Sequence, residues 1–416
     1  MIRFILADLR RMWAGALVVV LLVALSVALG VAVTLQERAL RLGSARAADK
    51  FELIVGAAGS QTQLVLSSVF LQTAPLPLLS GETLQKLGAD PRVKWAAPIG
   101  FGDSFQAQPI VGTTTTLIAE TAKGFADGRM FAEEGEAVAG AAVDLALGAT
   151  VVPMHGLAGE GSHRHNDVTY RIVGKLKPTG TAWDRAILVP IQAVWHIHGL
   201  GEHDEHDEHE EHDEHDEHDH HHGFDADAPL HEDWDDAELP GLPAILVKPK
   251  TIADAYKLRQ DYRAAPTQAV FPAEVLTALY STMGDARAVL AAIAIGAQVL
   301  VAAALILVTV IHVGQRRRQI GALRAFGAPR GAVFALVWGE LMALIGAGVA
   351  LGYGLGWGVS AALGAAFTAR NGVVLPVGLV CDDGVAALVV LGFAGLLAAI
   401  PAWRAYAEPT VEALRG

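Results

Sequence analysis

The sequence predicts a membrane protein with four transmembrane α-helices and a large α+β extracytoplasmic domain inserted between helices 1 and 2. The first observation is composition, because 52% of the 416 residues are hydrophobic and only 18% are charged, which is too apolar for an average soluble enzyme. The second is a set of four long stretches with almost no charge. The third is a segment of about 250 residues between the first two stretches, in which strand-like and helix-like patterns alternate.

Each of the four stretches is long enough to cross a bilayer. Residues 12–36 hold no charge and would form a helix of about 37 Å, more than the roughly 30 Å of a hydrocarbon core. This run exceeds the apolar part of a signal peptide, so we expect a retained anchor. Residues 288–315 and 384–403 are the second and fourth spans. Residues 331–369 are too long for one straight span and too short for two, which predicts either one long helix or a helix followed by a turn.

Basic residues orient these spans. Residues 315–330 carry five arginines and no acid, so the positive-inside rule places this loop in the cytoplasm. Both termini are then cytoplasmic, and the domain between spans one and two lies outside. Arg38, Arg41 and Arg46 follow the first span on the outer side and oppose this orientation, but the five-arginine loop outweighs them.

The expected organisation follows from these boundaries. It comprises an N-terminal cytoplasmic segment with the first span (1–36), the α+β extracytoplasmic domain (37–287), the second span (288–315), a cytoplasmic coupling loop (316–330), the third span with its extension (331–369), an outer loop (370–383), the fourth span (384–403) and a cytoplasmic tail (404–416). Residues 199–240 are expected to interrupt the extracytoplasmic domain as a disordered His/Asp/Glu-rich insertion. Residues 167–195 alternate as strands do, and residues 243–262 predict a strand followed by a helix.

The net charge of −13 comes from one segment. Residues 202–238 contain 19 of the 44 acidic residues and 10 of the 16 histidines, with no Lys or Arg. From 203 to 218 every third residue is a histidine, and imidazoles at this spacing beside carboxylates can converge on a borderline-soft divalent ion such as Zn²⁺. A solubilising spacer, the alternative, would need the acids but not the histidines. We therefore expect metal binding, which should weaken as histidine protonates below about pH 6.5.

The candidate metal ligands are mostly histidines of this run. They are His203, His206, His209, His212, His215, His218, His220, His221 and His222. Two further pairs, His163 with His165 and His196 with His198, form His-x-His motifs that could build a better-ordered site, and His155 lies near the first pair. Ordinary exposed loop histidine is the alternative for each pair. The single cysteine excludes a Cys-based zinc cage and an intramolecular disulfide.

Two polar or small-residue features stand within the third stretch. Glu340 interrupts an apolar helix, where a centred carboxylate costs about 2.5–3.5 kcal/mol on insertion scales. It is expected to face a dimer interface or a stalk partner, or else to lie near the cytoplasmic headgroups. Gly348, Gly352 and Gly356 have the spacing that lets two helices approach closely, so we expect them to serve packing.

Residues 316–356, RRRQIGALRAFGAPRGAVFALVWGELMALIGAGVALGYGLG, resemble the core of FtsX-like, or MacB/LolC-type, ABC transporter permeases. That family has a cytoplasmic Arg-rich turn with a Leu-Arg-Ala-x-Gly stretch, then a Glu-bearing, Gly-rich helix. Residues 401–416 (PAWRAYAEPTVEALRG) are similar to the family's ending, and residues 170–190 to its periplasmic core domain. One departure is Gln319, where the family often has Glu. The His/acid insertion is not general to the family and suggests a zinc-linked subgroup.

The resemblance implies a homodimer or close heterodimer of permease chains and a separate cytoplasmic ATPase. The residues expected to couple to that ATPase are Arg316, Arg317, Arg318, Gln319, Leu323, Arg324 and Gly327. The chain has no G-x-x-x-x-G-K-[ST] motif, so we expect no nucleotide on it and no enzymatic activity of its own.

These expectations combine into one function. The sequence predicts a permease subunit in a bacterial inner membrane that couples the ATPase to motion of a periplasmic domain, in divalent metal handling or transport with zinc as the expected ion. Its expected partners are the ATPase, a second permease copy, a periplasmic metal-binding protein and membrane lipids, with no nucleic acid. The alternatives are lipoprotein extraction or efflux of a non-metal substrate, and a non-transporting FtsX-like signalling scaffold, with the His-rich loop only buffering metal.

Overall fold

The computed structural model describes residues 13–72, 74–155, 168–200, 223–232, 234, 239–282, nine residues between 288 and 303, and 328–407. The chain forms two compact units. The helical unit comprises Met1–Arg41, Met283–Ala366 and Leu375–Gly416, and the α+β unit comprises Leu42–Thr282 and Phe367–Val374.

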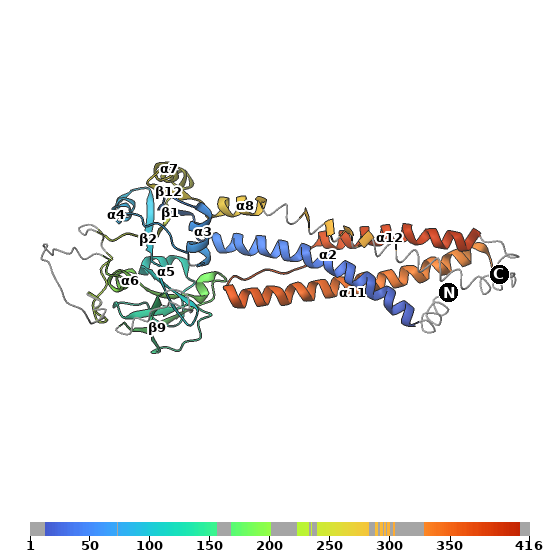
Figure 1. Ribbon diagram of the computed structural model, residues 1–416, viewed down its shortest axis with the longest axis horizontal. Coiled ribbons are helices and arrows are strands. Elements are labelled where there is room, and N and C mark those ends of the chain that lie inside the picture. The colour runs from blue at the N-terminus through green and yellow to red at the C-terminus, as the bar shows by residue number, and fades with distance from the viewer. Residues whose placement is uncertain are drawn as a thin grey trace, which may run out of the picture. The chain divides into compact units, whose positions relative to one another are not determined.

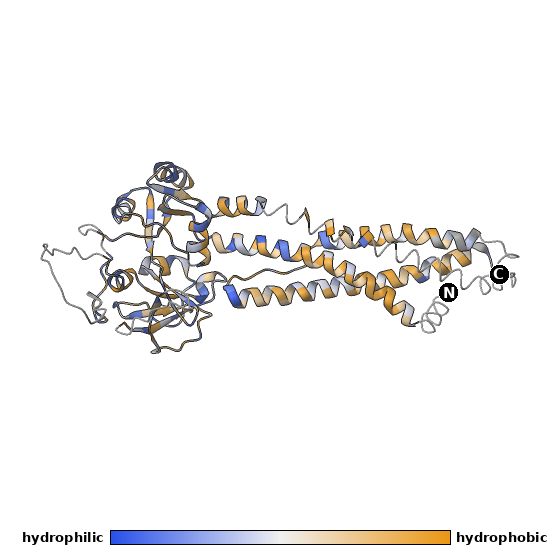
Figure 2. Ribbon diagram, in the orientation of Figure 1, coloured by the Kyte–Doolittle hydropathy of each residue, from blue (hydrophilic) through white to orange (hydrophobic). Residues whose placement is uncertain are grey.

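Three long helices make up the described part of the helical unit. They are α2 (Trp13–Ala48), α11 (Arg330–Asn371) and α12 (Cys381–Ala407) (Figure 1). Each contains a segment long and apolar enough to cross a membrane, and Figure 2 shows apolar residues along their length. Only nine residues of the expected second span, residues 288–315, are described, so the number of four spans stays a prediction. Residues 331–369 lie in one continuous helix, the first of the two expected arrangements.

Glycines let α2 and α11 approach closely, as their spacing predicts. A Cβ added at Gly348 would lie 2.6 Å from Val23 Cβ, and one at Gly352 would lie 2.7 Å from the Ala24 carbonyl oxygen. Both distances are shorter than real Cβ contacts, so any larger side chain would push the helices apart.

An ion pair connects α2 to the start of α12. Arg38 donates two hydrogen bonds to the Asp383 carboxylate, at 2.8 and 2.9 Å, and Asp383 Oδ2 also accepts the Val380 N–H. Tyr353 of α11 donates to the Asp383 carbonyl oxygen at 2.8 Å. Asp383 lies in the first turn of α12, so the same carboxylate also caps the start of that helix. The pairing also shows that Arg38, which opposes the expected orientation, is a neutralised charge.

The α+β unit is built on two sheets in the described residues. The four-stranded sheet has the order β12-β1-β11-β2, and the eight-stranded sheet has the order β5-β9-β6-β10-β4-β3-β8 with β7 beside β9. The strands are β1 (Leu53–Ala57), β2 (Val93–Ile99), β3 (Asp103–Phe105), β4 (Gln108–Thr113), β5 (Phe125–Gly128), β6 (Glu136–Ala139), β7 (Thr150–Val151), β8 (Met154–His155), β9 (Tyr170–Leu176), β10 (Ile187–Pro190), β11 (Ala244–Pro249) and β12 (Thr267–Val270).

Short helices cover these sheets. They are α3 (Gln61–Phe70), α4 (Glu82–Ala89), α5 (Thr115–Thr121), the 3₁₀ helix η1 (Ala182–Arg185), α6 (Ile191–Ile197), α7 (Ile252–Tyr262) and α8 (Pro272–Thr282). The expected strand and helix within residues 243–262 are β11 and α7. Residues 167–195 hold strands β9 and β10 as expected, but their last part is helix α6.

Each sheet has its own hydrophobic core. Leu53, Leu84 and Ile245 belong to the core of the four-stranded sheet, and Val151, Ile172 and Val189 to that of the eight-stranded sheet. Helix α6 contributes to both, through Ile191 and Trp195 on one side and Val194 on the other. Burying that much apolar surface fixes α6 firmly, which matters because it carries two of the predicted histidines at its end.

Candidate metal centre

The edge of the eight-stranded sheet brings an acid and a histidine together. Strand β3 begins with Asp103, strand β8 ends with His155, and the antiparallel register places these two residues directly opposite each other. Opposite residues in an antiparallel pair have Cβ atoms about 4.5–5.5 Å apart, so their side chains can meet. The Asp103 side chain is 3% exposed and that of His155 is 56% exposed, so the pair joins the core to the surface.

Helix α6 supplies a third residue. His198 is the C-cap of α6, and its N–H donates to the Val194 carbonyl. The helix packs very closely on the sheet, because a Cβ added at Gly100 would lie 2.8 Å from Ile191 Cδ1, and one at Gly112 would lie 2.5 Å from Val194 Cγ2. These two glycines pair through reciprocal hydrogen bonds and leave room for the helix. The tight packing aims the His198 ring at Asp103.

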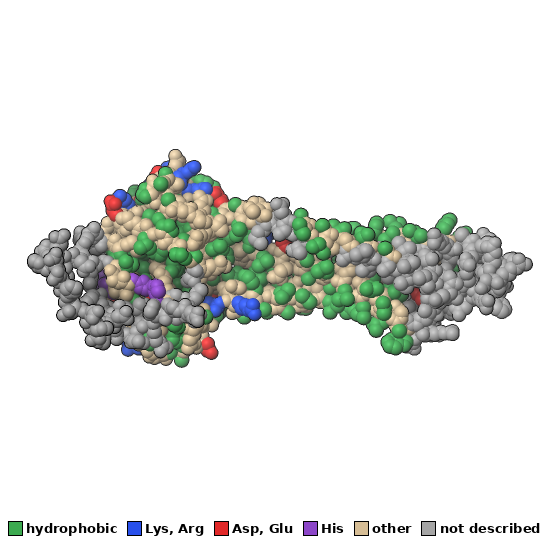
Figure 3. Space-filling model, in the orientation of Figure 1, with side chains coloured by type: hydrophobic (Ala, Val, Ile, Leu, Met, Phe, Trp, Pro, Cys, Tyr) green, Lys and Arg blue, Asp and Glu red, His purple; other side chains and the backbone are tan. Residues whose placement is uncertain are grey.

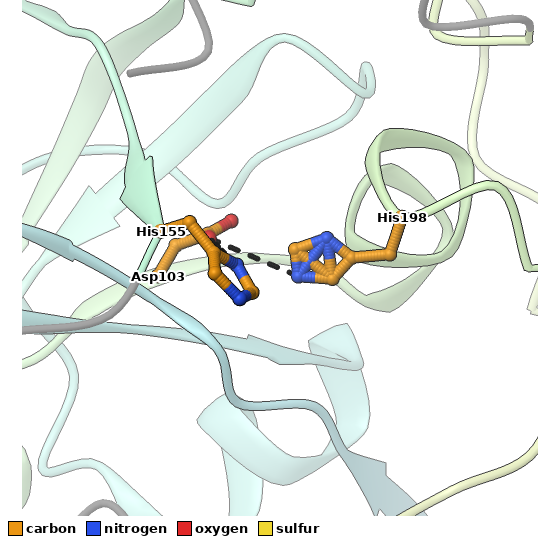
Figure 4. Close-up of side chains that lie close together, drawn as sticks. All are labelled: Asp103, His155 and His198. Carbon is orange, nitrogen blue, oxygen red and sulfur yellow. Dashed lines mark ion pairs between the residues drawn. The ribbon is translucent and has the colours of Figure 1, made fainter. Parts of the chain in front are cut away.

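The donor atoms of the three side chains lie close to one another (Figure 4). His155 Nδ1 lies 3.5 Å and His198 Nε2 lies 3.8 Å from Asp103 Oδ1, and the three donor atoms all lie within 4.8 Å of one another. In a tetrahedral zinc site with bonds of about 2.0–2.1 Å, neighbouring donor atoms are about 3.3 Å apart. A small closure of the three side chains would therefore coordinate one ion, with a fourth position left for another ligand.

His196 takes part in a different arrangement. Its Nδ1 lies 3.0 Å from Glu134 Oε1, a direct hydrogen bond, and the Glu134 side chain is 5% exposed. Glu134 is held by its own backbone N–H, which donates to the Ala228 carbonyl at 3.1 Å. His196 and His198 thus contact separate carboxylates, although only one residue separates them.

The core beneath these groups carries a negative potential. Tyr170 is fully buried in the eight-stranded sheet. Burial raises the pKa of the Tyr170 hydroxyl well above its usual value, and the carboxylates of Asp103 and Glu134 raise it further. A cation held by Asp103 would be stabilised by the same field.

The described structure settles the location of only some predicted ligands. Of the two His-x-His pairs, His198 enters the three-residue cluster and His196 does not. The other candidates lie outside the described residues: His163, His165, His203, His206, His209, His212, His215, His218, His220, His221 and His222. Histidine side chains of the α+β unit are visible as one patch in Figure 3.

Sequence reasoning did not single out Asp103 as a member of this cluster. It stands alone in the stretch Phe-Gly-Asp-Ser-Phe, and a single acid between aromatic residues gives no metal signal. The one clue is its position between Phe101 and Phe105, because a carboxylate that is buried among apolar side chains needs a compensating partner.

The expected ATPase-coupling residues 316–327 also lie outside the described part of the chain, and Glu340 is half-buried within α11.

Comparisons with known proteins agree with the sequence motifs. Residues 291–409 match the family model of the FtsX-like permease C-terminal domain, which confirms the resemblance to FtsX-like permeases. No curated protein matches the chain.

Two solved structures are weakly similar. The periplasmic region of MacB from Actinobacillus actinomycetemcomitans is 11% identical with a TM-score of 0.34, covering 56% of this chain and 95% of that one. The extracellular domain of the noncanonic ABC-type transporter YknZ from Gram-positive bacteria is 11% identical with a TM-score of 0.28, covering 52% and 98%. Similarities of this size do not define a fold.

Proposed function

We propose that this chain is the permease subunit of an ABC transporter whose extracytoplasmic domain binds a divalent metal, with zinc as the expected ion. The transporter class rests on the family match over residues 291–409 together with three helices apolar enough to span a membrane. The metal role is carried by one observation, the convergence of Asp103, His155 and His198.

The donor set favours zinc over harder cations. Two imidazoles and one carboxylate suit a borderline ion, whereas Ca²⁺ and Mg²⁺ prefer sites made of oxygen ligands. Three protein ligands with an open fourth position are typical of zinc sites that exchange a ligand, rather than of closed structural sites. Such a site suits a protein that takes up and passes on metal.

The His/acid run extends this proposal. His198 stands four residues before Glu202 in the sequence, where the run begins. Many weak sites close to one ordered site would raise the local metal concentration, as multivalent binding does. The run would collect ions, and the cluster would hold one of them.

The proposal includes the partners that the family resemblance implies. A separate ATPase would contact residues 316–327 on the cytoplasmic side, with both termini also cytoplasmic, four spans per chain and a second permease chain completing the complex. A periplasmic metal-binding protein would exchange ions with the α+β unit. ATP hydrolysis would then take place on the partner and move the α+β unit.

Growth of cells tests the metal role against its alternatives. Strains would carry the wild type, Asp103→Asn, or a deletion of residues 202–222, in zinc-poor and zinc-rich media. A growth defect of both variants only in zinc-poor medium supports metal acquisition, and one only in excess zinc supports export. An envelope or chaining defect that is the same at every zinc level contradicts the metal role and favours the signalling scaffold. Wild-type growth of both variants at all zinc levels also contradicts it.

A further inference from the structure

A cavity of about 140 Å³ lies in the α+β unit, next to the candidate metal centre. Its lining includes Asp103 and Ser104 of β3, Phe70 and Leu71 at the end of α3, and Arg185 of η1. Asp103 thus belongs both to the metal cluster and to the wall of this cavity. We propose that the cavity binds a small organic carboxylate, which pairs with Arg185 and completes the coordination of the metal held by Asp103, His155 and His198.

Arg185 has no anionic partner among the described residues. Within the described residues, its guanidinium makes no hydrogen bond or ion pair. The neighbouring Asp184 does not neutralise it, because that carboxylate accepts hydrogen bonds from the backbone N–H groups of Thr179 and Gly180 and from the Thr179 hydroxyl. A half-buried guanidinium beside a cavity is a ready partner for an anion, and its planar fork matches a carboxylate.

Arg185 is also held in place. A Cβ added at Gly372 would lie 3.2 Å from Arg185 Cγ, so the aliphatic stem packs against the backbone there. A stem fixed in this way loses little side-chain entropy when a ligand binds.

Strained backbone gathers around the same cavity. Three non-glycine residues in the described chain have positive φ: Leu71 at 53°, Gln106 at 49° and Ala107 at 62°. Leu71 and Ala107 line the cavity, and Gln106 precedes Ala107 in the turn between β3 and β4. Such conformations are costly for side chains other than glycine, and they concentrate at ligand sites.

The lining selects the kind of anion. Phe70, Leu71, Ala107, Pro109 and Ala182 give the cavity apolar walls, whereas Gln72, Ser104 and Asn371 add polar residues to its lining. Apolar walls favour an organic skeleton over sulfate or phosphate. The negative charge of Asp103 repels a carboxylate in the absence of metal, so a bound Zn²⁺ should strengthen binding by removing that repulsion and offering its open position.

Equilibrium binding of succinate to the purified full-length chain in detergent tests this inference, which rests on the proposed metal site. The variant is Arg185→Gln, and the matched control is Arg263→Gln at the exposed C-cap of α7. Zinc loading should tighten succinate binding about tenfold or more, and Arg185→Gln should weaken it about tenfold or more without changing zinc affinity. The control should match the wild type.

Further measurements distinguish a failure of this inference from a failure of the proposed metal site. Sulfate should bind much more weakly than succinate, and metal-free Asp103→Asn should bind succinate more tightly than the metal-free wild type. Equal succinate affinity for Arg185→Gln and the wild type would overturn the inference, and so would equal binding of sulfate. A wild type that binds no zinc would overturn the metal site, yet the Asp103→Asn arm would still decide whether the cavity takes a carboxylate.

Discussion

Two buried carboxylates of the eight-stranded sheet, Asp103 and Glu136, lie in opposite kinds of surroundings. Glu136 on β6 is 1% exposed and accepts hydrogen bonds from Arg129, from the Ala132 N–H and from Arg171. Asp103 on β3 lies 3.5 Å from His155 Nδ1 and 3.8 Å from His198 Nε2. Arginines neutralise the first carboxylate within the fold, whereas the second is grouped with two histidines with which it could hold a metal ion.

The difference shows how to distinguish a carboxylate that stabilises the fold from one that belongs to a ligand-binding site. A carboxylate that is paired with arginines contributes to stability, and its removal should lower the free energy of unfolding. A carboxylate grouped with two histidines should contribute to metal affinity instead. The following predictions test this contrast between the Glu136 region and the Asp103 region.

The largest effect is expected for Asp103→Asn on zinc affinity. Loss of the one charged ligand should weaken the ordered site by at least about 100-fold, since changes even to groups outside the ligand set cost 10–100-fold. Competition with a zinc-binding dye would measure this in a chain that lacks residues 202–222, so that the run does not mask the site. Replacement of exposed His231 by Ala is the control. Unchanged zinc affinity in Asp103→Asn would contradict the assignment of the cluster as a zinc site.

Glu136→Gln should lower stability instead of zinc affinity. The substitution leaves Arg129 and Arg171 without their shared carboxylate, which should cost about 2 kcal/mol of unfolding free energy at pH 7. Chemical denaturation of the full-length chain in detergent, followed by tryptophan fluorescence, would measure it. A stability loss in Asp103→Asn as large as that in Glu136→Gln would erase the contrast.

The pH dependence of Glu136 has a definite sign. Burial raises its pKa, but the hydrogen bonds from Arg129 and Ala132 and the charge of Arg129 lower it more, so the pKa lies below its usual value. Its contribution is therefore present above the unfolded pKa of about 4.3 and is lost as pH falls through the lower folded pKa. The stability difference between wild type and Glu136→Gln should be full at pH 7, begin to fall near the unfolded pKa of about 4.3 and vanish only below the folded pKa.

Gly102→Ala sharpens the comparison within the Asp103 region. A Cβ at this position would lie 2.8 Å from His198 Nε2 and would push the ring away from its present place. Zinc affinity should fall about tenfold, because ligands must be held within about 0.5 Å of their working positions. Gly88→Ala in α4, where an added Cβ meets nothing within 4 Å, is the matched control. Equal zinc affinity in both variants would mean that His198 is not a ligand.

The smallest effect is expected for His196→Ala. His196 is hydrogen-bonded to Glu134 and lies outside the cluster, so the loss should cost about 1 kcal/mol of stability and leave zinc affinity within about twofold. The same denaturation and dye-competition measurements apply. A tenfold loss of zinc affinity would place His196 at the metal and contradict the separation of the two pairs.

Local patterns predicted much of this fold. Uniform apolar runs predicted α2, α11 and α12, and the spacing of Gly348 and Gly352 predicted close helix packing, although not that α2 would be the partner of α11. Hydropathy can do this because a membrane helix makes its backbone hydrogen bonds within itself. The partner of Arg38 was not predictable, since Asp383 is 345 residues away in sequence.

The candidate site was only partly predictable for the same reason. The His-x-His motif singled out His198, but the pairing of Asp103 with His155 depends on the register of a two-residue strand, β8, that lies about 50 residues further along the chain than Asp103. Strand pairings over such distances are set by packing of the whole sheet and leave no mark in local sequence. The repetitive run, by contrast, is evident in the sequence but lies outside the described residues.

X-ray absorption spectroscopy of the zinc-loaded chain without residues 202–222 tests the central claim most directly. It should show one zinc per chain, with two imidazole nitrogens and carboxylate oxygen in the first shell, and His198→Ala should remove one of the two imidazoles. A chain that holds no zinc after this deletion, or a spectrum that His198→Ala leaves unchanged, would contradict the assignment of Asp103, His155 and His198 as a metal centre.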